Sequence, residues 1–230
     1  MAEQNSGYGQ ATPNDSADEM AAAAFIVKQM IAKLGTAKLV QVKAVNGGGL
    51  EPGGTVDVLP LVQQIDGNGY GTPHGVVHGL PWSRQQGGKN AVICDPMVGD
   101  VGYVVVQDRD ISTVKKQDPG AATTTGYLPA TWRRFDISDG IYAGGCLNVA
   151  PDQYLIFTAD GIRLVDRNGN SVEMDKTGVK IVDLSGNKFT TNSSGVNITD
   201  VNANQIVMAA GFVNIITPVL QVNGVPVTVP

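Results

Sequence analysis

Apolar and polar residues alternate with a period of two along much of the chain from Ala37 onward, which predicts a mainly β protein. Short alternating runs lie near residues 38–45, 55–59, 75–80, 91–94 and 101–106, and turn residues separate them. Five short strands in one such stretch suit a small barrel, in particular an OB-fold barrel. We expect an irregular excursion at 113–130 and a short strand between 131 and 141.

The residues before this barrel follow a different pattern. Residues 1–14 are small and polar, which predicts a flexible arm. Asp15 or Ser16 can cap a helix that runs to about Leu34, and Gly35 can end it. This helix is apolar on more than one face, so we expect it to be buried against its own domain or a neighbouring subunit.

A repeat with a step of 17 residues follows Pro151. Glycines fall at positions 161, 178 and 195, aspartates at 166, 183 and 200, and asparagines at 170, 187 and 204. Gly161, Gly178 and Gly195 each open a strand, and glycine permits a positive φ at such a corner. Each unit is therefore predicted to form strand, turn, strand, turn, which is typical of a repeat architecture.

Two columns of apolar residues keep the same step. The first contains Ile162, Leu164, Val179, Ile181, Val196, Ile198, Val213 and Ile215, and the second contains Leu155, Phe157, Val172, Met174, Phe189, Ile206 and Met208. A unit of this size cannot bury its apolar face alone, so either one chain coils into a solenoid or several chains wind together.

The small number of units favours an intertwined trimeric β-helix, a needle in which three chains share one axis. The first column is then expected to face the axis, and most backbone hydrogen bonds are expected to lie between chains. At about 4.8 Å per strand, a needle that begins near Tyr154 would be roughly 45 Å long.

Composition and charge narrow the functional classes. The 230 residues are 42% hydrophobic but only 16% charged, and they include 29 glycines, which agrees with many turns and few solvated helices. The net charge is −5 and no basic patch is visible, which argues against a protein that follows a nucleic-acid backbone.

Residue types that carry chemistry are few. His74 and His78 have the spacing of a helical zinc site, but Pro73, Gly75 and Gly79 argue against a helix, so we interpret them as structural or surface histidines. The aspartates of the repeat could bind calcium, as in Gly/Asp-rich β-rolls, but those rolls use a denser repeat, so corner-forming turns are favoured. No nucleophilic, Walker or dinucleotide motif is present. We therefore expect no catalytic residue, no cofactor and no metal site, and a protein that is not an enzyme.

Two segments carry a family resemblance. Residues 97–112, MVGDVGYVVVQDRDIS, are similar to the last barrel strand and following helix start of a known family, and residues 132–141, WRRFDISDGI, are similar to its bridging segment. With the helix and the repeat, they make residues 15–220 resemble the central membrane-puncturing spike of the baseplate of contractile-tailed bacteriophages. In that family an OB-fold base carries a triple-stranded β-helix needle. The type VI secretion spike is a more distant relative.

The resemblance implies a homotrimer that is assembled in the host cytoplasm and located in the virion, at the tip of the tail baseplate. It also implies a hub protein at the barrel end and mechanical piercing of the host outer membrane. Many members hold an iron ion near the tip with a His-x-His pair, whereas His74 and His78 lie in the barrel region. We expect the point to close by packing of Val225, Val227 and Val229, or under a small capping protein.

The predicted division is an arm and helix at 1–36, an OB-fold barrel at 37–112, a bridging segment at 113–150, and the needle with its tip at 151–230. Two other functions compete with the structural spike. A trimeric β-helical tailspike that cleaves host surface polysaccharide would need paired carboxylates in a groove. Sugar-stacking aromatics would also be expected, yet Trp82 and Trp132 precede the repeat. A nucleic-acid-binding OB protein would need an aromatic platform and basic charge.

Overall fold

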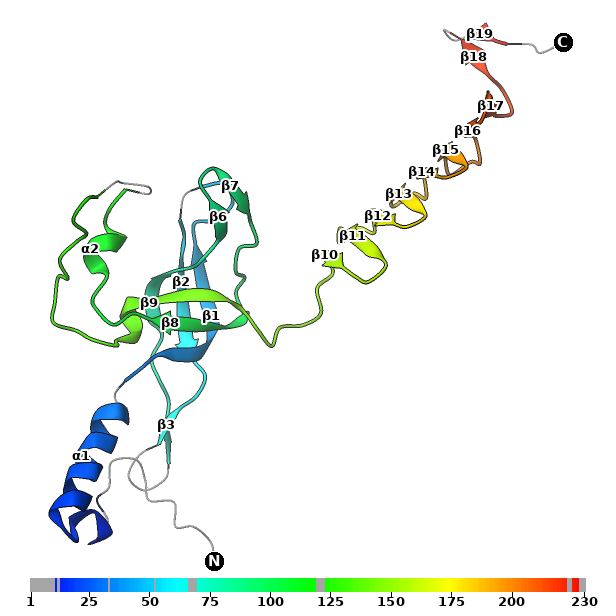
Figure 1. Ribbon diagram of the computed structural model, residues 1–230. Coiled ribbons are helices and arrows are strands. Elements are labelled where there is room, and N and C mark those ends of the chain that lie inside the picture. The colour runs from blue at the N-terminus through cyan, green and yellow to red at the C-terminus, as the bar shows by residue number, and fades with distance from the viewer. Residues whose placement is uncertain are drawn as a thin grey trace, which may run out of the picture. The chain divides into compact units, whose positions relative to one another are not determined.

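The computed structural model describes residues 11, 13–32, 34–51, 53–65, 70–118, 123–222 and 225–227. The protein is mainly β, and its chain divides into two compact units, Met1–Asn148 and Val149–Pro230 (Figure 1). Most of the arm expected at 1–14 lies outside the described residues. The two units are treated separately below.

The N-terminal helix of the first unit, α1 (Glu19–Ala32), follows a 3-10 turn, η1 (Pro13–Ser16). It begins later than the sequence indicated, because Asp18 caps it: the backbone N–H of Ala21 donates to Asp18 Oδ1 at 2.7 Å. None of the side chains described in α1 is buried. The burial that we expected for this apolar helix is therefore not provided by the parts of the single chain that the structure describes.

A five-stranded antiparallel sheet forms the centre of the first unit, in the order β5-β2-β1-β8-β9. Its strands are β1 (Ala37–Asn46), β2 (Thr55–Pro60), β5 (Val77–Pro81), β8 (Val101–Val106) and β9 (Gly140–Gly145). The sheet curls, because Trp82, which follows β5, forms a bridge with Tyr142 of β9 at the opposite edge. The backbone N–H of Ser83 donates to the Tyr142 carbonyl at 2.8 Å, so the two edges are joined.

Two strands differ from the sequence prediction. The strand expected at 91–94 is part of a separate hairpin, in which β7 (Asn90–Val92) pairs with β6 (Gln85–Gly87). The fifth strand of the sheet is instead β9, which lies within the segment that we had assigned to the bridge. Its sequence GIYAGG has little strand propensity, but its position requires a small residue, since a Cβ atom at Gly140 would overlap Val104.

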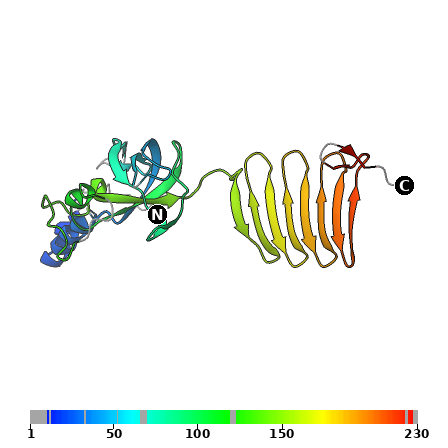
Figure 2. The same ribbon diagram turned by 90° about the horizontal axis from the view of Figure 1, so that it is seen from above.

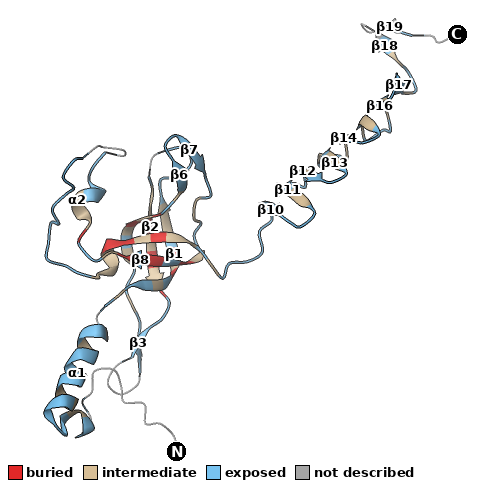
Figure 3. Ribbon diagram, in the orientation of Figure 1, coloured by how far each residue is buried: buried red, intermediate tan, exposed pale blue. Residues whose placement is uncertain are grey.

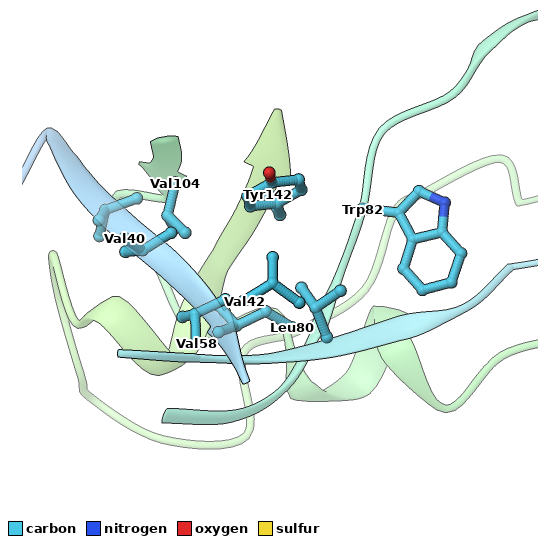
Figure 4. Close-up of a cluster of buried hydrophobic side chains, with 9 residues drawn as sticks. Val40, Val42, Val58, Leu80, Trp82, Val104 and Tyr142 are labelled. Carbon is cyan, nitrogen blue, oxygen red and sulfur yellow. The ribbon is translucent and has the colours of Figure 1, made fainter. Parts of the chain in front are cut away.

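The interior of the curled sheet is the only place where the structure buries large apolar side chains among the described residues. Alternate residues of each strand point inward, as expected for a half-buried sheet. The cluster is shown in Figures 3 and 4 and consists of Val40, Val42, Val56, Val58, Leu80, Trp82, Val104, Val106 and Tyr142.

Shorter elements complete the first unit. The hairpin of β3 (Gln64–Ile65) and β4 (Gly71–Thr72) extends from the sheet, and α2 (Ser112–Lys115) and η2 (Ile137–Asp139) lie in the segment between β8 and β9. The predicted excursion at 113–130 contains α2 at its start, and residues 119–122 are outside the description.

The second unit contains an eight-stranded antiparallel sheet in which each strand pairs with the next along the chain (Figure 2). Its strands are β10 (Tyr154–Phe157), β11 (Gly161–Val165), β12 (Ser171–Asp175), β13 (Gly178–Val182), β14 (Lys188–Asn192), β15 (Gly195–Thr199), β16 (Gln205–Ala209) and β17 (Phe212–Ile216). A separate hairpin follows, formed by β18 (Gln221–Val222) and β19 (Val225–Pro226).

This pairing differs from the prediction that most backbone hydrogen bonds lie between chains. The corners are short enough for every strand to pair with its successor in the same chain, so the backbone ladder of β10–β17 is formed within one chain. A second copy can therefore meet the body of this sheet through its side chains.

Candidate functional site: the apolar face of the repeat sheet

The strand register places both apolar columns of the repeat on one face of the sheet. Residues directly opposite each other in paired strands share a face, and so do residues two apart in one strand. One row across the eight strands is Leu155, Leu164, Val172, Ile181, Phe189, Ile198, Ile206 and Ile215, and the other is Phe157, Ile162, Met174, Val179, Thr191, Val196, Met208 and Val213. We call these sixteen positions the apolar face; Thr191 is its one polar member.

The apolar face is uncovered in the single chain. None of the side chains described between residues 149 and 221 is buried, in contrast to the interior of the first unit (Figure 3). Phe157 is 72% exposed and Val213 is 64% exposed. An open apolar surface of this extent marks an interaction site in a soluble protein.

The opposite face of the sheet is mainly polar. Its central row contains Arg163, Glu173 and Lys180, which lie on neighbouring strands. Glu173 accepts from Arg163 Nε at 3.0 Å and from Lys180 Nζ at 3.4 Å. These exposed pairs contribute little to stability, but they show which face is suited to water.

The aspartates of the repeat form its corners. Asp166 Oδ1 accepts from the backbone N–H groups of Asn168 and Asn170, and its Oδ2 accepts from the Asn170 side chain at 2.6 Å. Asp183 and Asp200 bind Asn187 and Asn204 in the same way. In each case the hydrogen bond from the asparagine side chain is the main reason that the pKa of the aspartate lies below its ordinary value. This geometry favours corner-forming turns over calcium ligation.

Asparagine side chains also join successive corners, a feature that the sequence reasoning missed. Asn170 Oδ1 accepts from the backbone N–H of Leu184 at 2.8 Å, and Asn187 Oδ1 accepts from that of Val201 at 3.0 Å. The equivalent position for Asn204 is Pro218, which has no N–H, and Asn204 Oδ1 is buried without a hydrogen-bond partner among the described residues. The signal in the sequence was the proline at the fourth position of the series.

The repeat glycines are required mainly by close backbone contact. A Cβ atom at Gly161, Gly178 or Gly195 would overlap the carbonyl oxygen of Met174, Thr191 or Met208, respectively. Gly178 and Gly195 also have positive φ angles, as expected, but Gly161 is not among the glycines with positive φ. The explanation from backbone conformation therefore holds for two of these three corners.

The predicted tip residues are only partly described. The backbone of Val225 lies in β19 and the side chain of Val227 is exposed, whereas Val229 lies outside the described residues. The backbone N–H of Val227 donates to the Leu220 carbonyl at 2.7 Å. The closure of the point by these valines stays a prediction.

The two histidines make separate contacts in the first unit. His74 Nε2 lies 3.0 Å from the carbonyl of Val62, and His78 Nδ1 lies 2.7 Å from Asp57 Oδ2. The hydrogen bond with His78 is the main cause that lowers the pKa of Asp57. Within the part of the chain that the structure describes, no group of three His, Cys, Asp or Glu side chains is placed to hold a metal ion.

The two segments that carry the family resemblance are joined by a cluster of charged residues. Arg133 Nη2 lies 3.2 Å from Asp110 Oδ1 and 3.0 Å from Asp139 Oδ1, and the side chains of both aspartates are buried. Asp110 also accepts from the hydroxyls of Ser112 and Thr131. These hydrogen bonds, Ser112 first, hold the pKa of Asp110 far below its ordinary value. The cluster fixes the segment between β8 and β9 to the edge of the sheet.

Comparison with known proteins does not identify a family. No protein-family model matches the chain, and no curated protein sequence matches it. Among the described residues, no helix has both the length and the apolar character needed to cross a membrane.

Proposed function

We propose that three copies of this chain form the membrane-puncturing spike at the baseplate tip of a contractile phage tail. In this proposal the first unit is an OB-fold base that binds a hub protein, and the repeat sheets of three chains enclose one axis as a triple-stranded β-helix. Sheath contraction drives this needle through the host outer membrane. The resemblance of residues 15–220 to that family supports the role.

The uncovered apolar face is the observation that carries the proposal. Eight strands about 4.8 Å apart span about 38 Å, and five residues of about 3.4 Å give a width of about 17 Å, so one face covers about 650 Å². Specific protein interfaces bury about 800 Å² per partner. The face therefore has nearly the size of a stable interface, and its polar reverse side is suited to solvent.

The side chains of the apolar face favour a narrow shared axis. They are mostly Val, Ile, Leu and Met, and aromatic residues are 6% of the chain. A three-sided arrangement gives each inward side chain contacts to two other copies, so all sixteen positions can be covered at once. Ile162, Leu164, Val179 and Ile181 would then face the axis together with their equivalents in later units.

The curled sheet of the first unit supports an OB-fold base. OB folds are five-stranded, partly open barrels. The bridge between Trp82 and Tyr142 brings the two edge strands together, and the nine buried side chains fill the interior.

Sedimentation equilibrium of the full chain tests the assembly. We expect a trimer whose mass does not change over a wide dilution range, and a monomer would overturn the proposal. Antibody labelling of purified virions should mark the baseplate tip. Release of glycan fragments from host surface polysaccharide would instead favour the tailspike enzyme.

A further inference from the structure

A repeating apolar face gives three chains poor information about their axial alignment. Sliding one chain by one unit of 17 residues places Val179 and Ile181 at the level of another chain's Ile162 and Leu164, which are equally apolar. The corners and the polar row also repeat with this step. Register is weakly specified where neighbouring registers present equivalent surfaces.

One strand of the apolar face breaks the repeat. The inward pair of β12 is Val172 and Met174, and that of β16 is Ile206 and Met208. The equivalent strand β14 has Phe189 and Thr191 instead. It therefore presents one large ring and one small hydroxyl where its equivalents present two aliphatic side chains.

The Thr191 hydroxyl has no polar partner on its own face. Its cross-strand neighbours there are Val179 and Val196. No hydrogen bond joins this hydroxyl to any other described residue, and the side chain is only half-buried in the single chain. An assembly that covers the apolar face would bury this hydroxyl among aliphatic groups unless another hydroxyl lies beside it.

We propose that Thr191, together with Phe189, sets the axial register of the three chains; this inference rests on the trimer proposed above. In the aligned assembly three Thr191 hydroxyls meet at one level of the axis, and each can donate to one neighbour and accept from the other. After a slip of one unit, Thr191 faces Met174 or Met208 of another copy. Its hydroxyl is then buried without a partner, which is costly, and three phenyl rings no longer share a layer with three small side chains.

The same reasoning applies to a buried polar residue that specifies register in a coiled coil at some cost in stability. Any axial slip also removes the three-fold symmetry, because the displacements around a closed ring of three chains must sum to zero. Aligned trimers therefore contain one environment for each side chain, whereas slipped trimers contain several.

Methyl NMR of isoleucine-labelled protein measures this directly. The unaltered chain should give one signal for each isoleucine methyl group of the apolar face, such as those of Ile181, Ile198 and Ile206. Thr191→Val and Thr191→Met should remain trimeric in sedimentation but give two or more signals for these groups. Thr190→Val is the matched control, because Thr190 lies on the same strand but on the polar face, between Lys180 and Asn197. It should keep single signals.

Two further variants separate register from general destabilisation. Thr191→Ser keeps the hydroxyl and should keep single signals. The double variant Met174→Thr with Thr191→Met moves the hydroxyl layer by one unit and should restore single signals relative to Thr191→Met alone.

Single signals for both Thr191→Val and Thr191→Met would overturn the inference, because register would then be set elsewhere in the chain. Multiple signals for Thr190→Val would overturn it as well. A monomeric unaltered chain would give a different result, in sedimentation, and would refute the trimer itself.

Discussion

Replacing one inward residue by a charge gives the sharpest test of the proposed assembly. Ile181 lies in the middle of the apolar face and is 42% exposed in the single chain. Ile181→Asp should therefore be tolerated by the sheet itself, because an exposed carboxylate there can remain hydrated. In a trimer the same change would place three carboxylates around one axis.

The expected penalty is large. Packed sheets lie about 10 Å apart, so inward carboxylates would lie within about 8 Å of each other. At an effective dielectric constant of about 20, each of the three pairs repels by about 2 kcal/mol, which sums to about 6 kcal/mol. Assembly also loses about 1 kcal/mol of apolar burial per chain. The total of about 9 kcal/mol, before desolvation, corresponds to more than six orders of magnitude in the association constant.

Sedimentation equilibrium and far-ultraviolet circular dichroism of the full chain provide the assay. Ile181→Asp should be monomeric with an unchanged β spectrum. Thr190→Asp is the matched control, because it adds the same charge to the polar face beside Lys180, and it should stay trimeric. A stable trimer of Ile181→Asp at neutral pH would show that the apolar face does not line the axis.

Three further predictions concern the corners. Gly178→Ala should lower the melting temperature more than Gly186→Ala, because the first adds an overlap with the Thr191 carbonyl, whereas the second has only a positive φ of 92° to accommodate, at about 1 kcal/mol. The Asn187 side chain lowers the pKa of Asp183 from 3.8, so its stabilisation is complete above that pH and is lost as the pH falls through the lower folded value; Asp183→Asn should reduce the difference in melting temperature between about pH 6 and about pH 2. Pro218→Ala supplies a donor for Asn204 Oδ1 and should add about 1 kcal/mol in thermal melts, with residue 218 protected from amide exchange; an exchanging amide would contradict this.

The repeat was predictable because each of its parts recurs. Leu164 and Ile181 occupy equivalent positions with a step of 17, and the alternation within each strand assigns them to one side. The first strand begins at Tyr154, where the pattern placed it. Local periodicity contains this information because the strands pair with their immediate successors.

The parts that depend on distant contacts were not predictable in the same way. Strand β9 is glycine-rich and is a strand because Gly140 allows β8 to approach and Tyr142 closes the sheet beside Trp82. The contacts of Arg133 with Asp110 and Asp139 likewise connect segments that show no common period. Hydropathy patterns describe faces of single elements, and they contain little information about which side chain lies beside which.

The asparagine bridges between corners have a consequence for how the length of the sheet can vary. Asn170 and Asn187 each hold the corner of the following unit, so a change in length preserves the bridges only when it adds or removes 17 residues. Duplication of residues 171–187 would lengthen the sheet by about 10 Å and leave every corner intact. An insertion of half a unit would place a strand where a corner is needed. The gene for such a protein can therefore lengthen or shorten the sheet in whole increments, with the proline at 218 retained as the terminus.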